Sequence, residues 1–123
     1  MTAQQKPLDI VLNYFNAWTT GRFQEAGAEL SESLKIETPI NFYPGKKNFM
    51  EAVQLTASMV SAVDLLVALS GIEDAVLIYD LTTPLGKIRI AEYFQVQDDV
   101  IVFIRQIHDT APFRDAGFDK TSK

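Results

Sequence analysis

Apolar and polar positions in the first half of the chain recur with the spacing of helices. Over residues 8–20 the apolar side chains fall on one stripe and the polar ones on the opposite stripe, which is typical of an amphipathic helix. Pro7 suits the first turn of this helix, and Gly21 suits the position just past its end. A short second helix is expected from residue 23 to about residue 30, and a third helix is expected to open at Gly45.

The second half has the two-residue period of strands. A short strand at residues 34–38, ended by Pro39, comes before the third helix, and four longer strands follow near residues 63–71, 75–83, 87–97 and 100–109. Helices followed by hairpin-linked strands predict an α+β fold, a curved antiparallel sheet wrapped as a cone around about three N-terminal helices. We expect a single domain over residues 1–123, with residues 114–123 as a frayed polar tail.

The strand at residues 87–97 carries one residue that breaks its pattern. Its predicted inner face reads Ile88, Ile90, Glu92, Phe94 and Val96, so a carboxyl group stands where the pattern requires an apolar side chain. An isolated buried carboxylate is costly, so Glu92 must be paired, protonated or facing a cavity. The cavity is the alternative that implies a function.

The register of the two neighbouring hairpins determines which side chains lie opposite Glu92. A two-residue turn at Pro84-Leu85 places Asp80 opposite Arg89 on the outer face, and it places Leu77 opposite Glu92.

The last hairpin leaves two alternatives open. A two-residue Asp98-Asp99 loop places Arg105 across from Glu92, whereas a three-residue loop places Ile104, Gln106 and His108 on the face of Glu92. Because a slip of one residue exchanges the whole set, the register decides the composition of the site.

Composition narrows the chemistry. The net charge of −5 argues against a nucleic-acid partner, and the apolar runs are too short to span a membrane. Without a secretory signal or cysteines, we expect a cytoplasmic protein. One histidine and no cysteine make a zinc site improbable, and no glycine-rich phosphate loop follows a strand, so no cofactor is expected.

The order of elements resembles the nuclear transport factor 2-like cone fold, and within it the branch of SnoaL-like proteins and ketosteroid isomerases. The resemblance covers about residues 8–113 and is carried by four segments, residues 14–23, 36–39, 91–96 and 101–109. Its motifs are specific for the fold and weak for any one activity, because the superfamily includes enzymes, binding proteins and assembly modules.

The resemblance implies roles for individual residues. Tyr14 matches the tyrosine that steroid isomerases keep two turns before the glycine of the first helix, and Glu92 matches their protonated oxyanion-hole acid or the acid/base residue of SnoaL-like cyclases. The aspartate base of the isomerases is replaced by Thr38, which cannot act as a base near neutral pH. A limonene-epoxide-hydrolase arrangement would need Asp80 and Arg89 inside the pocket rather than on the outer face.

Two hypotheses follow. The first is a cofactor-free isomerase, cyclase or hydratase acting on a small apolar carbonyl compound, with Glu92, Tyr14 and His108 as catalytic residues. Ligand-contacting side chains would be Trp18, Phe42, Phe49, Tyr79 and Gln106. The second is a non-catalytic binding or assembly module in which Glu92 satisfies Arg105 or Tyr14. Under both hypotheses we expect a homodimer through the outer sheet face, because residues 100–104 of the last strand are apolar on both faces.

Overall fold

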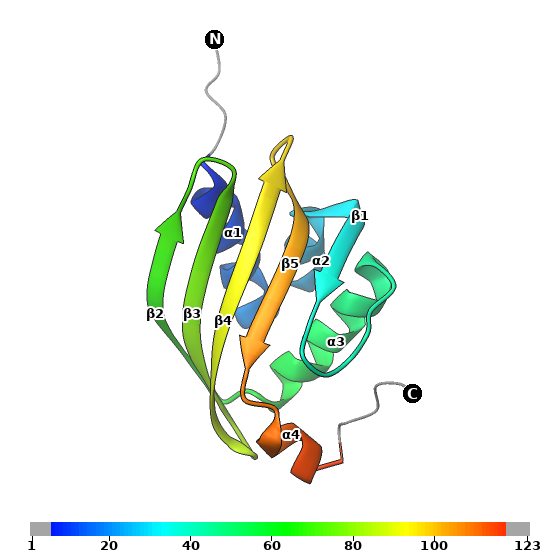
Figure 1. Cartoon of the computed structure of the whole chain (residues 1–123), viewed down its shortest axis with the longest axis vertical. Helices are drawn as coiled ribbons and strands as arrows, with labels where there is room; N and C mark the ends of the chain where they lie inside the picture. Colours follow the sequence, from blue (N-terminus) through cyan, green and yellow to red (C-terminus); the bar gives the residue numbers. More distant parts are fainter. Residues whose placement is uncertain (1–5, 118–123) are drawn as a thin grey trace.

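The computed structural model describes residues 6–117 and contains four helices and five strands within them (Figure 1). In chain order these elements are α1 (Pro7–Thr19), α2 (Phe23–Ala28), β1 (Leu30–Glu37), α3 (Lys46–Met59), β2 (Ala62–Ser70), β3 (Asp74–Thr83), β4 (Gly86–Gln97), β5 (Val100–His108) and α4 (Ala111–Asp115).

The five strands form one curved sheet with the order β1-β5-β4-β3-β2. The helices α1, α2 and α3 lie on one side of it, as Figure 1 shows, which confirms the predicted α+β cone. Three hairpins join β2 to β5, and these strands pair antiparallel. The predicted antiparallel pairing does not extend to one edge, where β1 runs parallel to β5. No hairpin joins β1 to a neighbour, so no turn fixes its direction.

The bounds of the helices and strands differ from the predicted bounds in two places. The second helix ends at Ala28, and β1 begins at Leu30, four residues before the predicted start. Two residues of the predicted frayed tail, Arg114 and Asp115, belong to α4. Asp109 supports the start of that helix, since its Oδ1 accepts a hydrogen bond from the Ala111 amide at 3.0 Å. Ala116 and Gly117 follow in a turn, and residues 118–123 of the predicted tail lie outside the described residues.

The core lies between the inner face of the sheet and the apolar stripe of α1. This helix ends as predicted, since Gly21 adopts a φ of 82° that other residues rarely take. Burial of this stripe against the sheet supplies most of the apolar contact that holds the helix in place. The side chains that are nearly or fully buried here include Ile10, Val11, Tyr14, Phe15, Leu77, Phe94, Ile101 and Ile104.

The outer face of the sheet stays uncovered within the described part of the chain. Ion pairs lie on it, including the predicted pair across β3 and β4, in which Arg89 Nε and Nη2 donate to the two Asp80 carboxylate oxygens at 2.8 and 3.0 Å. The Asp80 hydrogen bond from Arg89 lowers the pKa of that carboxyl. No helix in residues 6–117 is long and apolar enough to cross a membrane.

Candidate functional site

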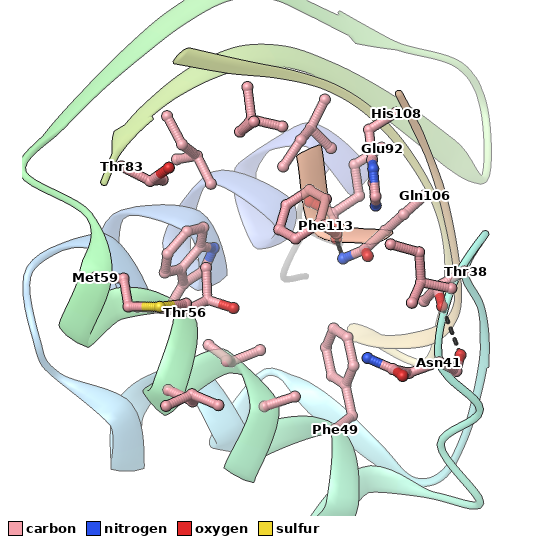
Figure 2. Close-up of a pocket in the computed structure, with 18 of the residues that line it drawn as sticks. Thr38, Asn41, Phe49, Thr56, Met59, Thr83, Glu92, Gln106, His108 and Phe113 are labelled. Carbon is pink, nitrogen blue, oxygen red and sulfur yellow. Dashed lines mark hydrogen bonds between the residues drawn. The ribbon is translucent and has the colours of Figure 1, made fainter. Parts of the chain in front are cut away.

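A cavity of about 160 Å³ opens between the inner face of the sheet and helices α1 and α3. Its walls come from those two helices, from the loop after β1, from strands β3 to β5 and from α4. Figure 2 shows polar side chains gathered on one wall, where Glu92, Gln106 and His108 lie, with Thr38 and Asn41 beside them. Met59 and Thr56 lie across the cavity from this wall.

Glu92 lies in this wall with a side chain that is only 1% exposed. The β3–β4 register is the predicted one, with Leu77 opposite Glu92, and it places Tyr79 on the same face. The Tyr79 hydroxyl donates to Glu92 Oε1 at 2.7 Å, and Gln106 Nε2 donates to Oε2 at 2.9 Å. Both donors are neutral, so the buried carboxyl group has hydrogen bonds but no cation among its partners.

The β4–β5 pairing combines features of both predicted registers. The loop is the two-residue Asp98-Asp99 turn, with positive φ at both residues, as hairpins of this length require. Val102 then forms a bulge, because Gln95 pairs with Phe103 while Val96 pairs with Ile101. One extra residue reverses the faces of the rest of the strand.

This bulge determines what Glu92 meets. Gln106 lies opposite Glu92, and His108 lies on the same face. Arg105 points outward, where its Nε and Nη2 donate to both Glu37 carboxylate oxygens at 3.0 Å. The hypothesis that Arg105 or Tyr14 satisfies Glu92 is therefore wrong, because Tyr79 and Gln106 fill that role.

Burial shifts the pKa of Glu92 and of the nearby Tyr14 and Tyr79. Desolvation raises the pKa of Glu92, and the hydrogen bonds from Gln106 and Tyr79 partly offset that effect because they favour the charged form. Desolvation together with the nearby Glu92 charge raises the pKa of Tyr14 and of Tyr79 well above the ordinary value for a phenol. Both tyrosines therefore remain protonated donors at neutral pH.

Tyr14 contributes a free hydroxyl to the cavity. Its ring is buried against Phe94, at a centroid distance of 6.0 Å in an edge-on arrangement. Among the described residues no protein group forms a hydrogen bond with the Tyr14 hydroxyl. Every fully buried side-chain oxygen or nitrogen in this part of the chain has a hydrogen-bond partner. The hydroxyl oxygen is therefore reachable from the cavity that Tyr14 lines, where it can donate to a ligand.

His108 lines the cavity from the end of β5. Its Nδ1 is 3.0 Å from the backbone carbonyl oxygen of Asp109, and its ring packs on Phe113 at 5.1 Å. A carbonyl oxygen only accepts, so Nδ1 is the donor in this hydrogen bond. No hydrogen bond in the described residues joins His108 to Glu92.

The structure brings most of the predicted ligand-contacting residues together. Trp18, Phe49, Tyr79 and Gln106 line the cavity. The placement of Phe42 was wrong: its side chain is 79% exposed and lies outside the cavity, whereas Ile40 and Tyr43 of the same loop line it.

Several cavity residues were not predicted from the sequence. Asn41, Met59 and Phe113 line the cavity from a loop, a helix end and α4. Loops and helix ends carry no periodic pattern, so no signal in the sequence assigns these residues to the site.

Thr38, the residue that the resemblance matches to the aspartate of steroid isomerases, lies in the cavity wall. Its Oγ1 donates to the backbone carbonyl oxygen of Asn41 at 2.6 Å, which holds the loop after β1. Glu92 is thus the only carboxyl group among the lining residues that the structure describes, and no lysine or arginine lines the cavity there. Residues 6–117 also contain no cluster of three acidic or histidine side chains that could hold a metal ion.

The role of Gln106 can be tested through the ionisation of Glu92. Gln106→Leu removes a donor that favours the carboxylate, so we expect the pKa of Glu92 to rise further. The measurement is a carboxyl ¹³C NMR titration of the variant against the parent protein. Arg105→Leu, on the outer face, is the control and should leave that titration unchanged, and an unchanged titration in Gln106→Leu would contradict the hydrogen bond.

Comparisons with known proteins bear on the fold. No family model matches the chain, and no curated protein matches it. Among solved structures, a protein from Kribbella flavida is 28% identical with a TM-score of 0.81, over 90% of this chain and 93% of that one. An NTF2-like protein of unknown function from Cytophaga hutchinsonii is 21% identical with a TM-score of 0.78, over 93% and 99%.

A third similar structure, also from Kribbella flavida, is provisionally assigned as a ketosteroid isomerase. It is 15% identical, with a TM-score of 0.73 over 95% of this chain and 90% of that one. The three TM-scores, each over at least 90% of both chains, show a shared fold. The chain therefore has the nuclear transport factor 2-like fold.

Proposed function

We propose that this protein is a cofactor-free enzyme of the SnoaL-like and ketosteroid-isomerase-like type that moves a proton on a small apolar carbonyl compound. The observation that carries the proposal is the buried Glu92 carboxyl group in the wall of an otherwise mainly apolar cavity. Its raised pKa brings it closer to the range in which one group can both accept and return a proton.

The reaction would proceed in two balanced steps. The Glu92 carboxylate removes a proton from the carbon next to the substrate carbonyl, and the C–H electron pair moves to the oxygen to give an enolate. The Tyr14 hydroxyl donates a hydrogen bond to that oxygen and stabilises its charge. The Glu92 carboxylic acid then returns the proton to carbon, at the same or a conjugated position. His108 in the cavity wall would orient the substrate.

Tyr79 and Gln106 act as positioning residues in this mechanism. Each holds one oxygen of the Glu92 carboxyl group, at 2.7 and 2.9 Å, so the group has a fixed orientation before substrate arrives. A base fixed in this way needs little rearrangement to reach the transition state. This is a change from the sequence-based hypothesis, in which Gln106 would contact the substrate.

A specific observation favours a non-catalytic binding module as the second candidate. Thr38 stands where the isomerases have their base, and Glu92 already has a donor on each oxygen. Under this alternative the same cavity holds an apolar molecule without changing it.

Hydrogen exchange on a model ketone separates the two candidates. In D₂O, the wild-type protein should accelerate deuterium incorporation next to the carbonyl of 2-tetralone above the buffer rate, as followed by ¹H NMR. Binding of 2-tetralone, seen as a change in Trp18 fluorescence, without any accelerated exchange would favour the binding module.

The outer sheet face supports the proposal of a homodimer. Apolar side chains lie side by side across β2 to β5 on this face, and charges of both signs border them in the Asp80–Arg89 and Glu37–Arg105 pairs. A copy related by a two-fold axis would bury the apolar side chains against the same residues. They are Val67, Leu69, Val76, Ile78, Tyr93, Phe103 and Ile107.

Light scattering after gel filtration tests this proposal. We expect about twice the 13.8 kDa chain mass, and Phe103→Lys should give the monomer mass because it places a charge within the apolar face. The control is Ile72→Lys in the β2–β3 turn, a residue that is already 93% exposed, which should leave the dimer intact. A monomer mass for the wild-type chain at high concentration would contradict the proposal.

A further inference from the structure

The Glu92 carboxyl group is buried without a cation. Its two hydrogen-bond partners, Tyr79 and Gln106, are neutral. The arginines nearest in the sheet are committed elsewhere, since Arg89 pairs with Asp80 and Arg105 pairs with Glu37. A carboxylate in such a site has lost its hydration on folding and has gained no opposite charge in return.

The walls around it suit a positive charge. Six aromatic side chains line the cavity from α1, the loop after β1, α3, β3 and α4, and the face of an aromatic ring attracts a cation. No lining lysine or arginine in the described residues would repel an ammonium group, and the whole chain carries a net charge of −5. The six are Tyr14, Trp18, Tyr43, Phe49, Tyr79 and Phe113.

We propose that the cavity binds protonated apolar amines, with the ammonium group against the Glu92 carboxylate and the hydrocarbon body against the aromatic and aliphatic walls. This goes beyond the proposed function, because it concerns which molecules the cavity holds and needs no reaction. If the protein is an enzyme, such an amine inhibits it by occupying its base. If it is a binding module, such amines are its ligand class.

An amine is favoured over a neutral alcohol for a physical reason. Folding has already removed the carboxylate from water, so an arriving ammonium gains a charge-assisted hydrogen bond whose protein partner needs no further desolvation. An alcohol can donate one neutral hydrogen bond to the same oxygen. A carboxylic acid brings a second negative charge next to Glu92 and must bind as its rarer neutral form.

The chain supplies its own reporter for the test. Trp18 is the one tryptophan in the sequence, and it lines the cavity. Its fluorescence can be titrated at neutral pH with 1-adamantanamine, 1-adamantanol and adamantane-1-carboxylate. These three probes share one cage hydrocarbon and absorb no light at the wavelengths used for tryptophan fluorescence. We expect the amine to bind at least about tenfold more tightly than the alcohol, and the carboxylate most weakly.

Variants at Glu92 locate the effect. Glu92→Gln should abolish the preference for the amine over the alcohol, whereas Glu92→Asp, which keeps the charge, should retain it. The control Glu51→Gln removes an exposed carboxylate on α3 and should bind all three probes as the parent does. This control shows whether the loss of one negative charge elsewhere in the chain is enough to change the binding of the probes.

Equal binding of amine and alcohol, an amine preference that survives in Glu92→Gln, or no binding of any probe would each overturn the proposal. The outcome is independent of turnover, since the proposed reaction is tested by deuterium exchange on a ketone. Exchange without an amine preference would refute only the amine site, and an amine preference without exchange would refute only the enzyme.

Discussion

Glu92→Gln is expected to lower the rate of proton exchange on a bound ketone by about 10² to 10⁴-fold, the usual contribution of a general base. The amide has no basic site that can take a proton from carbon at neutral pH. The fold should survive, because the amide oxygen still accepts from Tyr79, and the amide nitrogen can donate to Gln106 once that side chain rotates. The measurement is deuterium incorporation by ¹H NMR, with equal binding of the ketone verified first.

The same variant should be more stable than the parent near neutral pH. Burial raises the pKa of Glu92 in the folded state, so the stability that this group contributes is fully present below its ordinary pKa and is lost as the pH rises through the raised value. Glutamine does not titrate, so its advantage in unfolding free energy should grow from acid toward neutral pH and then level off. We expect this gain to appear as a Tm difference between Glu92→Gln and the parent that is larger near neutral pH than in acid.

Denaturant unfolding at several pH values, with Glu51→Gln as the exposed control, measures that gain. A Glu92→Gln variant that exchanges protons like the parent would remove the base from the proposed mechanism. A variant that is less stable at every pH would show that the carboxylate is a favourable partner rather than a desolvated one.

Phe94→Ala is expected to cost about 3–5 kcal/mol of unfolding free energy, the largest stability effect we predict. Phe94 has no exposed surface and lies next to Glu92 on the inner face of β4, where its ring meets that of Tyr14 edge-on. Removing the ring leaves a void between α1 and the sheet, and the surrounding side chains can fill it only in part.

Chemical denaturation of Phe94→Ala and of Gln95→Ala measures this effect. Gln95 is the next residue of β4 and is exposed on the outer face, so its replacement should change the free energy by no more than about 0.5 kcal/mol. A similar loss of unfolding free energy in both variants would contradict the assignment of Phe94 to the buried face of β4 and of Gln95 to its exposed face.

The fold was predictable where the pattern of side chains is regular. The helical stripe of α1, the end of that helix at Gly21 and the turn at Pro84-Leu85 all follow from local rules, and the structure has them. The parallel pairing of β1 with β5 and the helix α4 depend on contacts between distant parts of the chain, and α4 is too short to show a period.

The site was predictable at its centre and not at its border. Glu92 was identified because a carboxyl group interrupts an apolar face, and the predicted turn at Pro84-Leu85 gives the register that puts Tyr79 on the same face. The bulge at Val102 has no signature because residues 100–104 around it are all apolar, so the sequence left the choice between Arg105 and Gln106 open. Phe42 was misplaced because periodicity does not say which way a loop side chain points.

A crystal structure of the protein under xenon pressure tests the central claim most directly, because xenon enters apolar cavities and shows where side chains leave space. We predict bound xenon between Trp18 and the wall that holds Glu92. In the same structure the two Glu92 carboxyl oxygens should accept hydrogen bonds from Tyr79 and Gln106. An interior filled by side chains without xenon, or a Glu92 carboxylate paired with Arg105, would contradict the account.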